Sequence, residues 1–407
     1  MSLIEQNKLR ADFPALTQKI RGKPLVYLDS AASALKPWPV IERISHFYTY
    51  ETSNVHRGAH YLADEATKNF EASREKVRSF LNAESTEEII FTQGTTGSLN
   101  LVAQSLGKML LKAGDEILVS ELEHHANIVP WQMIAETTGA KIVVAPVNND
   151  GEISIEKWSQ KLSSKTKIVA ISHCSNTLGS YVDIETITKL AHKAGALVVV
   201  DGAQAVSTIP VDVRALNVDF YAFSAHKLFG PYGVGVLYGK KELLLKMPPY
   251  QGGGSMISTV SFEKTTYNDL PYKFEAGTPH IEGVIALGVG IDYVLKVGFE
   301  KIHQIEHELL DYATAELSKI PGVLIFGTSK HKAPILSFAI EGFHHSDVSQ
   351  ILDQEGIAVR AGHHCTMPLL KRYNVSGTIR ASFSIYNNKA DVDALIKGLL
   401  KAKEMLL

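Results

Sequence analysis

The sequence has few cysteines and lacks any long apolar run. Cys174 and Cys365 are its only two cysteines, so at most one disulfide bridge could form. No run approaches the roughly 20 apolar residues that a membrane-spanning helix needs. The first 24 residues carry charges throughout and lack the apolar core of a signal peptide. We therefore expect a cytoplasmic protein that does not engage a membrane and keeps its thiols reduced.

Neither sign of charge dominates the chain, because 41 Lys and Arg stand against 43 Asp and Glu, for a net charge of −2. Nucleic-acid binding depends on an excess of basic residues, so this balance gives no reason to expect such a partner. The spacings C-x-x-C and H-E-x-x-H are also absent, and we expect no metal site. With 407 residues, the chain is long enough for two or three domains.

Short apolar runs alternate with helical patterns from residue 88 onward, which predicts an α/β fold with a mainly parallel sheet. Runs of β-branched and aromatic residues of this length are typical of strands buried on both faces. A second strand, helix, strand pattern over 335–385 predicts a smaller α/β domain, with a helix over 281–297 leading to it. The predicted strands of the larger sheet are 88–91, 116–119, 141–144, 167–171, 197–200, 220–223 and 233–238.

Two of these runs end in reactive residues. Asp201 follows 197–200, and Lys227 follows 220–223 with Ser224 and His226 beside it. Ligands of α/β sheets gather at the carboxyl ends of the strands, so both side chains are expected in one crevice. Pyridoxal phosphate requires a lysine that forms a Schiff base and an acid beside its ring nitrogen. Taken singly, the acid could cap a turn and the lysine could be solvated, but the pair favours a pyridoxal phosphate site.

Other polar segments fit the same cofactor. The Gly- and Thr-rich turn 92–98 precedes a helix expected from about Leu99, and its free N–H groups and the hydroxyls of Thr95 and Thr96 suit a phosphate. The His124 imidazole could lie flat on the pyridine ring, and Asn176 could bond its phenolic oxygen. His56 lies in a polar segment that could line a pocket or be a solvated loop.

Cys365 lies in the segment Val359–Pro368, which is rich in histidine and arginine. Positive charge near a thiol favours the ionised, nucleophilic form. An incidental loop thiol is the alternative. Cys174, at the end of a predicted strand, is expected to be a packed small apolar residue.

The chain resembles type II cysteine desulfurases of the SufS kind, which are class-V aminotransferases with the fold-type I architecture of pyridoxal phosphate enzymes. The resemblance covers nearly the whole chain in order. It is carried by the segments LDSAAS, VHRGAH, TQGTTGS, EHHANIVPW, VDGAQAV, FSAHKLFGP, GGGSMI, FEAGTP, VRAGHHC and IRAS.

The resemblance implies a role for each candidate residue. Lys227 would be the Schiff-base lysine, Cys365 would accept the sulfur, and His124 would stack on the cofactor and belong to the catalytic set. Thr278 would reach the phosphate of the other subunit of a homodimer. The remaining cofactor-binding residues would be Thr95, Thr96, Asn176, Asp201, Gln204, Ser224 and His226. The substrate-binding residues would be Arg380, Asn176, His56 and Arg360.

The resemblance also implies domains and partners. Residues 1–24 would pack on the small domain, 25–290 would form the large cofactor-binding domain, and 291–407 would form the small domain with the Cys365 loop. L-cysteine would be converted to L-alanine and a persulfide on Cys365. A SufE- or SufU-like acceptor would carry the sulfur to a Suf scaffold for iron-sulfur cluster assembly.

Three alternatives stay open. L-selenocysteine could be a further substrate or the main one, since selenium leaves without a strict need for Cys365. An aminotransferase would share cofactor and fold but would have no use for a loop thiol. A cofactor-binding regulatory subunit would need neither Lys227 nor Cys365. Gly97 and His280 depart from residues common in the family, which leaves the acceptor and the dimer contacts open.

Overall fold

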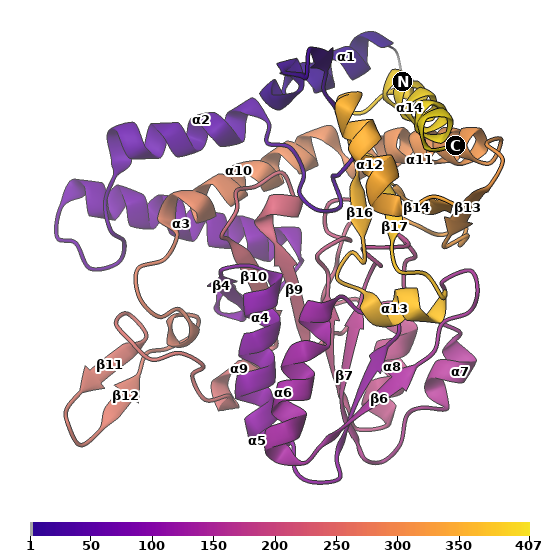
Figure 1. Ribbon diagram of the computed structural model, residues 1–407. Coiled ribbons are helices and arrows are strands. Elements are labelled where there is room, and N and C mark those ends of the chain that lie inside the picture. The colour runs from indigo at the N-terminus through magenta and orange to yellow at the C-terminus, as the bar shows by residue number, and fades with distance from the viewer. Residues whose placement is uncertain (1–2) are drawn as a thin grey trace.

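The apolar runs between residues 89 and 239 form one seven-stranded sheet in the computed structural model, which describes residues 3–407 (Figure 1). Its strand order is β4-β10-β9-β8-β7-β5-β6. Strands β6, β5, β7, β8 and β9 are mutually parallel, and β10 runs antiparallel to β9 and β4. The strands are β4 (Ile89–Thr92), β5 (Glu116–Ser120), β6 (Lys141–Ala145), β7 (Thr166–Ser172), β8 (Leu197–Asp201), β9 (Phe220–Ser224) and β10 (Gly235–Gly239).

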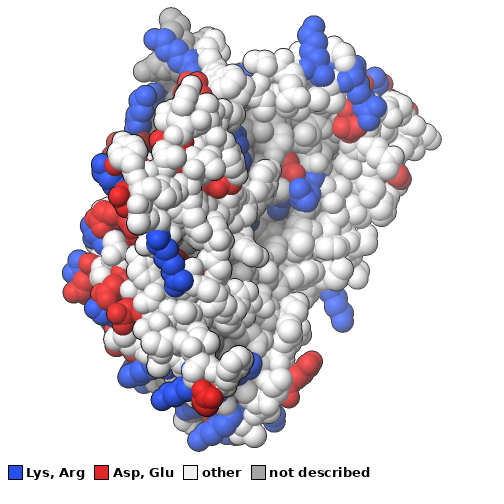
Figure 2. Space-filling view, turned by 90° about the vertical axis from the view of Figure 1, so that its left-hand side faces the viewer, with Lys and Arg blue, Asp and Glu red and all other residues white. Residues whose placement is uncertain are grey.

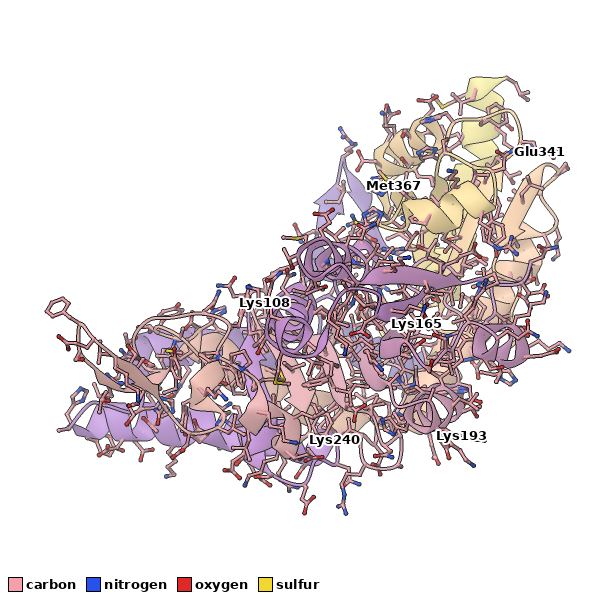
Figure 3. All side chains as sticks on the ribbon, turned by 90° about the horizontal axis from the view of Figure 1, so that it is seen from below. Lys108, Lys165, Lys193, Lys240, Glu341 and Met367 are labelled. Atoms are coloured by element: carbon pink, nitrogen blue, oxygen red, sulfur yellow. The ribbon has the colours of Figure 1, made fainter. Side chains whose placement is uncertain are left out.

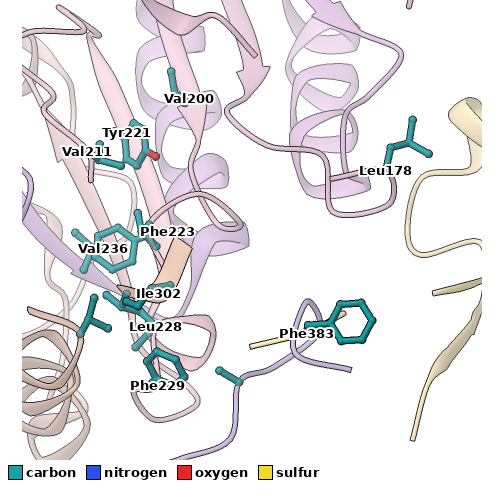
Figure 4. Close-up of a cluster of buried hydrophobic side chains, with 14 of the residues drawn as sticks. Leu178, Val200, Val211, Tyr221, Phe223, Leu228, Phe229, Val236, Ile302 and Phe383 are labelled. Atoms are coloured by element: carbon teal, nitrogen blue, oxygen red, sulfur yellow. The ribbon is translucent and has the colours of Figure 1, made fainter. Parts of the chain in front are cut away.

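Alternate residues of each strand pack on opposite faces of the sheet. In β9, Phe220 belongs to one apolar cluster, while Tyr221 and Phe223 belong to the other. This period of two follows from strand geometry and explains why the runs are apolar throughout. Figure 4 shows part of the larger cluster, where Phe223 lies beside Val236, its partner on the neighbouring strand.

Helices cover both faces of the sheet. Those whose buried residues pack in the larger cluster are α3 (Tyr61–Phe80), α8 (Ile184–Lys193) and α10 (Ile281–Val297). The opposite face is covered by α4 (Thr95–Val102) and α6 (Val129–Thr138). Helix α2 (Trp38–His46) packs along α10 (Figure 1). Short helices complete this part of the chain: α5 (Lys108–Leu110), α7 (Ile155–Ser159) and α9 (Lys241–Lys246).

A second sheet of four antiparallel strands, in the order β13-β14-β17-β16, is formed by the last third of the chain. Its strands are β13 (Val323–Phe326), β14 (Ile335–Ile340), β16 (Arg360–Gly362) and β17 (Thr378–Ser382). Its helices are α11 (Phe299–Leu317), α12 (His345–Gln354), α13 (Met367–Arg372) and α14 (Lys389–Leu406).

The first residues of the chain contact its last part. After α1 (Leu3–Ala11) and the short strands β1 (Lys19–Ile20) and β2 (Lys23–Pro24), β3 (Val26–Tyr27) pairs in parallel with β15 (Ile357–Ala358). Arg10 donates a hydrogen bond of 2.8 Å to Asp391 of α14. The Arg10 contact supports the predicted packing of segment 1–24, of which residues 1–2 lie outside the described residues, whereas β3 lies in the part predicted as the large domain. The division into 25–290 and 291–407 stays a prediction, supported by the separation of the two sheets.

The structure differs from the expectation in several places. Helix α4 begins at Thr95 and not near Leu99, so Thr95 and Thr96 lie in its first turn. Helix α11 was not predicted. A hairpin of β11 (Ile257–Val260) and β12 (Thr265–Tyr267) projects from the body of the protein with Phe262 fully exposed (Figure 1).

Candidate active site

A cavity of about 280 Å³ lies at the carboxyl ends of the parallel strands. Residues from both sheets line it, and Figure 2 shows a hollowed face with basic and acidic side chains inside the hollow. Most of the candidate residues line this one cavity: Thr95, Thr96, His124, Asn176, Asp201, Gln204, Ser224, His226, Lys227, Arg360, Cys365 and Arg380.

Lys227 and Asp201 reach the cavity from neighbouring parallel strands, as the sequence predicted. Strand β8 ends at Asp201, which is paired with Ala222 of β9, and a single turn after β9 carries Lys227. Burial lowers the pKa of Lys227 to about 8, although Asp201 opposes that shift. Burial raises the pKa of Asp201, while the Ala203 N–H and Lys227 act in the opposite direction. An amine that is partly unprotonated near neutral pH suits a lysine that acts as nucleophile and base.

The turn before α4 meets the end of β9 in a cluster of hydroxyls. Thr95 N and Oγ1 lie 2.8 and 2.7 Å from Ser224 Oγ. Gly94 has φ = 151°, and a Cβ on Gly235 would come within 2.4 Å of its Cα, so both positions require glycine. His226 Nδ1 is buried with no hydrogen-bond partner among the described residues. Hydroxyls, a helix N-terminus and an unpartnered ring nitrogen together form a donor set that fits the phosphate of the predicted cofactor.

His124 lies after β5 and is neutral in the folded protein. Its pKa is lowered to about 4, chiefly by burial and further by Lys227. Its Nδ1 accepts a hydrogen bond of 3.0 Å from Ala126 N, which fixes the ring. A neutral, fixed imidazole is suited to packing flat against a cationic ring.

A buried hydrogen-bond network around Glu123, the residue before His124, was not predicted. The Glu123 carboxylate accepts hydrogen bonds from Ser172 Oγ at 2.6 Å and Asn127 Nδ2 at 2.7 Å. The side-chain Oδ1 of Asn127 in turn accepts one from Trp131 Nε1. Burial raises the pKa of Glu123 to about 7. The segment EHHANIVPW contains all but one of these residues, so its polar positions were the available signal.

The Cys365 loop is held against the large sheet. The side-chain amide of Asn176 (Nδ2) donates a hydrogen bond of 2.7 Å to the main-chain carbonyl of His364. His364 and Cys365 both have positive φ, 49° and 58°, which is uncommon for residues with a side chain. Strained backbone of this kind often marks a functional loop. Cys365 is partly exposed and lines the same cavity as Lys227.

Arg380 is buried in the cavity wall. Its Nη1 donates to the Asn176 carbonyl at 2.7 Å, its Nη2 donates to Asp29, and its Nε has no partner among the described residues. Arg360 also donates to Asp29 and is half exposed. Asp29 and His364 were not predicted as site residues, although LDSAAS and VRAGHHC contain them.

Two candidates lie outside the cavity. His56 bonds Glu71 at 2.8 Å and packs on Tyr272, and it is not among the residues that line the cavity. Thr278 lines a different cavity, of about 750 Å³, together with His280. Their assigned roles stay predictions.

Cys174 is buried, as expected, with its Sγ 3.2 Å from the Gly179 carbonyl. Burial raises the pKa of this thiol to about 12. It is therefore far less reactive than a partly exposed thiol.

Within the described part of the chain, no helix is both long and apolar enough to cross a membrane. The same residues contain no group of three or more His, Cys, Asp or Glu that could hold a metal ion.

The aminotransferase class-V family model matches residues 26–395, so the chain belongs to that family. Its curated relatives include the probable cysteine desulfurase of Vibrio cholerae, 49% identical over 99% of this chain and 100% of that protein. The cysteine desulfurase of Synechococcus elongatus is 50% identical over 97% of this chain, which spans 63% of that longer protein. These similarities confirm the predicted class-V aminotransferase family and the predicted enzyme class, cysteine desulfurase.

Solved structures agree with these relatives. The cysteine desulfurase CsdA from Escherichia coli superposes with a TM-score of 0.92 at 43% identity, and 99% of each chain is covered. C-DES, solved as a lysine-to-alanine mutant with glycine covalently linked to its PLP cofactor, has a TM-score of 0.83 at 23% identity over 96% of this chain and 98% of its own, which shows the shared fold. The predicted fold-type I architecture and the dependence of the family on pyridoxal phosphate are confirmed.

Proposed function

We propose that this chain is a type II cysteine desulfurase of the SufS kind, which converts L-cysteine to L-alanine and takes the sulfur as a persulfide on Cys365. The observation that carries the proposal is that Lys227 and Cys365 line one cavity. An aminotransferase needs the lysine but not the thiol. The strained loop that presents Cys365 to the cavity therefore favours desulfuration.

The residues of the cavity divide into those that hold the cofactor and those that hold the substrate. When bound, pyridoxal phosphate withdraws electrons from the substrate's α-carbon. Lys227 would carry it covalently, Asp201 would keep its ring nitrogen protonated and His124 would cover its face. Asn176 and Gln204 would bond its phenolic oxygen. Its phosphate would be held by Thr95, Thr96, Ser224 and His226, with Thr278 supplied by the second subunit of a homodimer.

Arg380 would bind the substrate carboxylate through its guanidinium, since a fork of N–H donors matches a carboxylate. This contact orients the amino acid across the cavity, with its α-carbon toward Lys227 and its sulfur toward Cys365. The substrate's amine would displace Lys227 from its covalent bond to the cofactor, and the freed Lys227 amine then takes the α-proton.

The Cys365 thiolate attacks the substrate sulfur. A sulfur-sulfur bond forms as the bond between Cβ and sulfur breaks, and the carbon keeps the electron pair. Protonation of that carbon, and return of a proton from Lys227 to the α-carbon, complete alanine, and Cys365 is left as a persulfide.

The transfer of the sulfur from Cys365 to other proteins stays a prediction from the sequence. A SufE- or SufU-like protein would accept it, for iron-sulfur cluster assembly on a Suf scaffold in the cytoplasm. L-selenocysteine would be a further substrate, and His56 and Arg360 would assist substrate binding.

Mass spectrometry of the protein after exposure to L-cysteine tests the proposal. We expect the mass of one added sulfur atom on the peptide that contains Cys365, together with free alanine. Cys365→Ala should keep the visible absorption of bound cofactor and gain no sulfur. Sulfur found on another residue, or alanine production by Cys365→Ala at the wild-type rate, would contradict the assignment.

A further inference from the structure

Asp29 contacts two arginines of the site although the proposed reaction does not use it. It follows β3, and its side chain is 15% exposed. Its Oδ2 accepts a hydrogen bond of 2.9 Å from Arg360 Nη2, and its Oδ1 accepts one of 3.2 Å from Arg380 Nη2. One negative charge therefore lies between two positive charges.

The backbone holds these three residues in register. Arg360 of β16 lies directly opposite Arg380 of β17, an arrangement in which like charges repel. Asp29 forms a parallel bridge with Ser382 at the end of β17, so its carboxylate is fixed beside both guanidinium groups. Its charge offsets their repulsion. A further titratable group close to Asp29 is the Tyr27 phenol, whose pKa is raised by burial and by Asp29.

Both arginines line the cavity together with the Cys365 thiol. Positive charge near a thiol favours its ionised form. Other titratable groups line the same cavity or contact the Cys365 loop, namely Lys227, Asp201, Cys174, His124, His125, His226, His363 and His364.

We propose that Asp29 is a positioning residue that holds Arg360 and Arg380 in place and, by partly neutralising them, sets how readily Cys365 ionises. The inference rests on the proposed function in one respect, because Cys365 is important only if it accepts the sulfur. Its test does not require turnover, because ionisation of Cys365 is measurable in the resting holoenzyme.

The measurement is the pH dependence of Cys365 alkylation by iodoacetamide, followed on the Cys365 peptide. Asp29→Asn keeps the shape and one acceptor oxygen but removes the charge, so both arginines act on the thiol at full strength. The pH of half-maximal alkylation should fall by about half a unit, the effect of one charge several ångströms away in a partly hydrated site. Asp29→Glu restores the charge and should return the midpoint towards that of the wild type.

Asp353→Asn is the matched control, since Asp353 pairs with Arg21 on the surface and both side chains are more than half exposed. Its alkylation midpoint should equal that of the wild type. A midpoint in Asp29→Asn that is unchanged or higher, with the visible absorption of the cofactor retained, would overturn the inference.

A second variant tests the inference if Asp29→Asn does not fold. Arg360→Gln removes one positive charge and leaves Arg380 alone to oppose the charge of Asp29, so the pH of half-maximal alkylation should rise. The variant that combines Asp29→Asn with Arg360→Gln should have a midpoint between those of the two single variants. An unchanged midpoint in Arg360→Gln contradicts the inference. If the wild type gains no sulfur from cysteine while these midpoints still shift, the proposed function fails and the role of Asp29 stands.

Discussion

The main-chain N–H of His125 donates a hydrogen bond of 2.8 Å to the main-chain carbonyl of Cys365. The His125 ring adds a second bond, because its Nε2 accepts from Met367 N at 3.1 Å. Figure 3 shows Met367 on the small-sheet side of the molecule. The thiol loop is thus tied to the loop that carries His124, and these two bonds add to the one from Asn176 that holds the thiol loop against the large sheet.

We predict that His125→Ala slows persulfide formation about fivefold. The substitution keeps the main-chain bond and removes the side-chain acceptor, which costs about 1 kcal/mol of positioning. Single-turnover formation of the persulfide measures the effect, with the visible absorption of the cofactor expected to stay unchanged. His46→Ala, at an exposed histidine of α2, is the control. A wild-type rate in His125→Ala would show that the second bond has no role.

We predict that Arg380→Lys raises the KM for L-cysteine about 10- to 100-fold, with a smaller change in kcat. Lysine keeps the charge but loses the fork that matches a carboxylate, a loss of about 1.5–3 kcal/mol. Steady-state alanine production gives both constants. Arg372→Lys is the control, because Arg372 bonds the Val147 carbonyl and does not line the cavity. An unchanged KM in Arg380→Lys would place the substrate carboxylate elsewhere.

We predict that one of the two thiols reacts in the folded protein. Burial raises the pKa of the Cys174 thiol to about 12, whereas Cys365 is partly exposed. When native protein is titrated with a thiol reagent, one thiol per chain should react rapidly. Cys365→Ser should lose it and Cys174→Ser should keep it. The reverse result would exchange the roles of the two cysteines.

We predict that acid destabilises the protein through its buried histidines. Burial lowers the pKa of His173 to about 4, against about 6.5 in an unfolded chain. Between these values the unfolded chain binds a proton that the folded chain does not, so the free energy of unfolding decreases as pH falls from 6.5 to 4. His124, His226 and His364 shift in the same direction.

Thermal unfolding between pH 7 and 4 measures this dependence. His173→Gln should keep a partner for the Tyr221 hydroxyl, which lies 2.9 Å from His173 Nδ1, and should make the fall in Tm with acid less steep. The Tm of His46→Gln should fall with acid as steeply as that of the wild type. An equal slope in His173→Gln would mean that this histidine is not the source.

The strands and the pair of Asp201 and Lys227 were predictable because their signal is local. Each strand is a short apolar run, and a reactive residue directly after such a run lies at the edge of the sheet. Helix α10 was predicted with the observed bounds, Ile281–Val297, since its pattern is apolar and uninterrupted. The hairpin of β11 and β12 gave no such signal, because its strands are largely exposed and carry no buried face.

The parts that escaped prediction depend on contacts between distant residues. Nothing in the neighbourhood of Asp29 indicates that it bonds Arg360 and Arg380, since that contact exists only after β3 and β17 come together. The Glu123 network likewise needs Ser172 from another strand. The order of the strands and the partners of buried polar groups are set by tertiary packing, which no local pattern determines.

The bond between Asp29 and Arg360 joins residues that are 331 positions apart in the chain. A ribosome adds about 5–20 residues per second, so Asp29 leaves it on the order of 15–60 s before its partner does. During that interval the growing polypeptide contains the strands of the large sheet but lacks Arg360, Cys365 and Arg380. The cavity can therefore be completed only late in synthesis, and a chain terminated before Arg360 would lack both arginines and the Cys365 thiol.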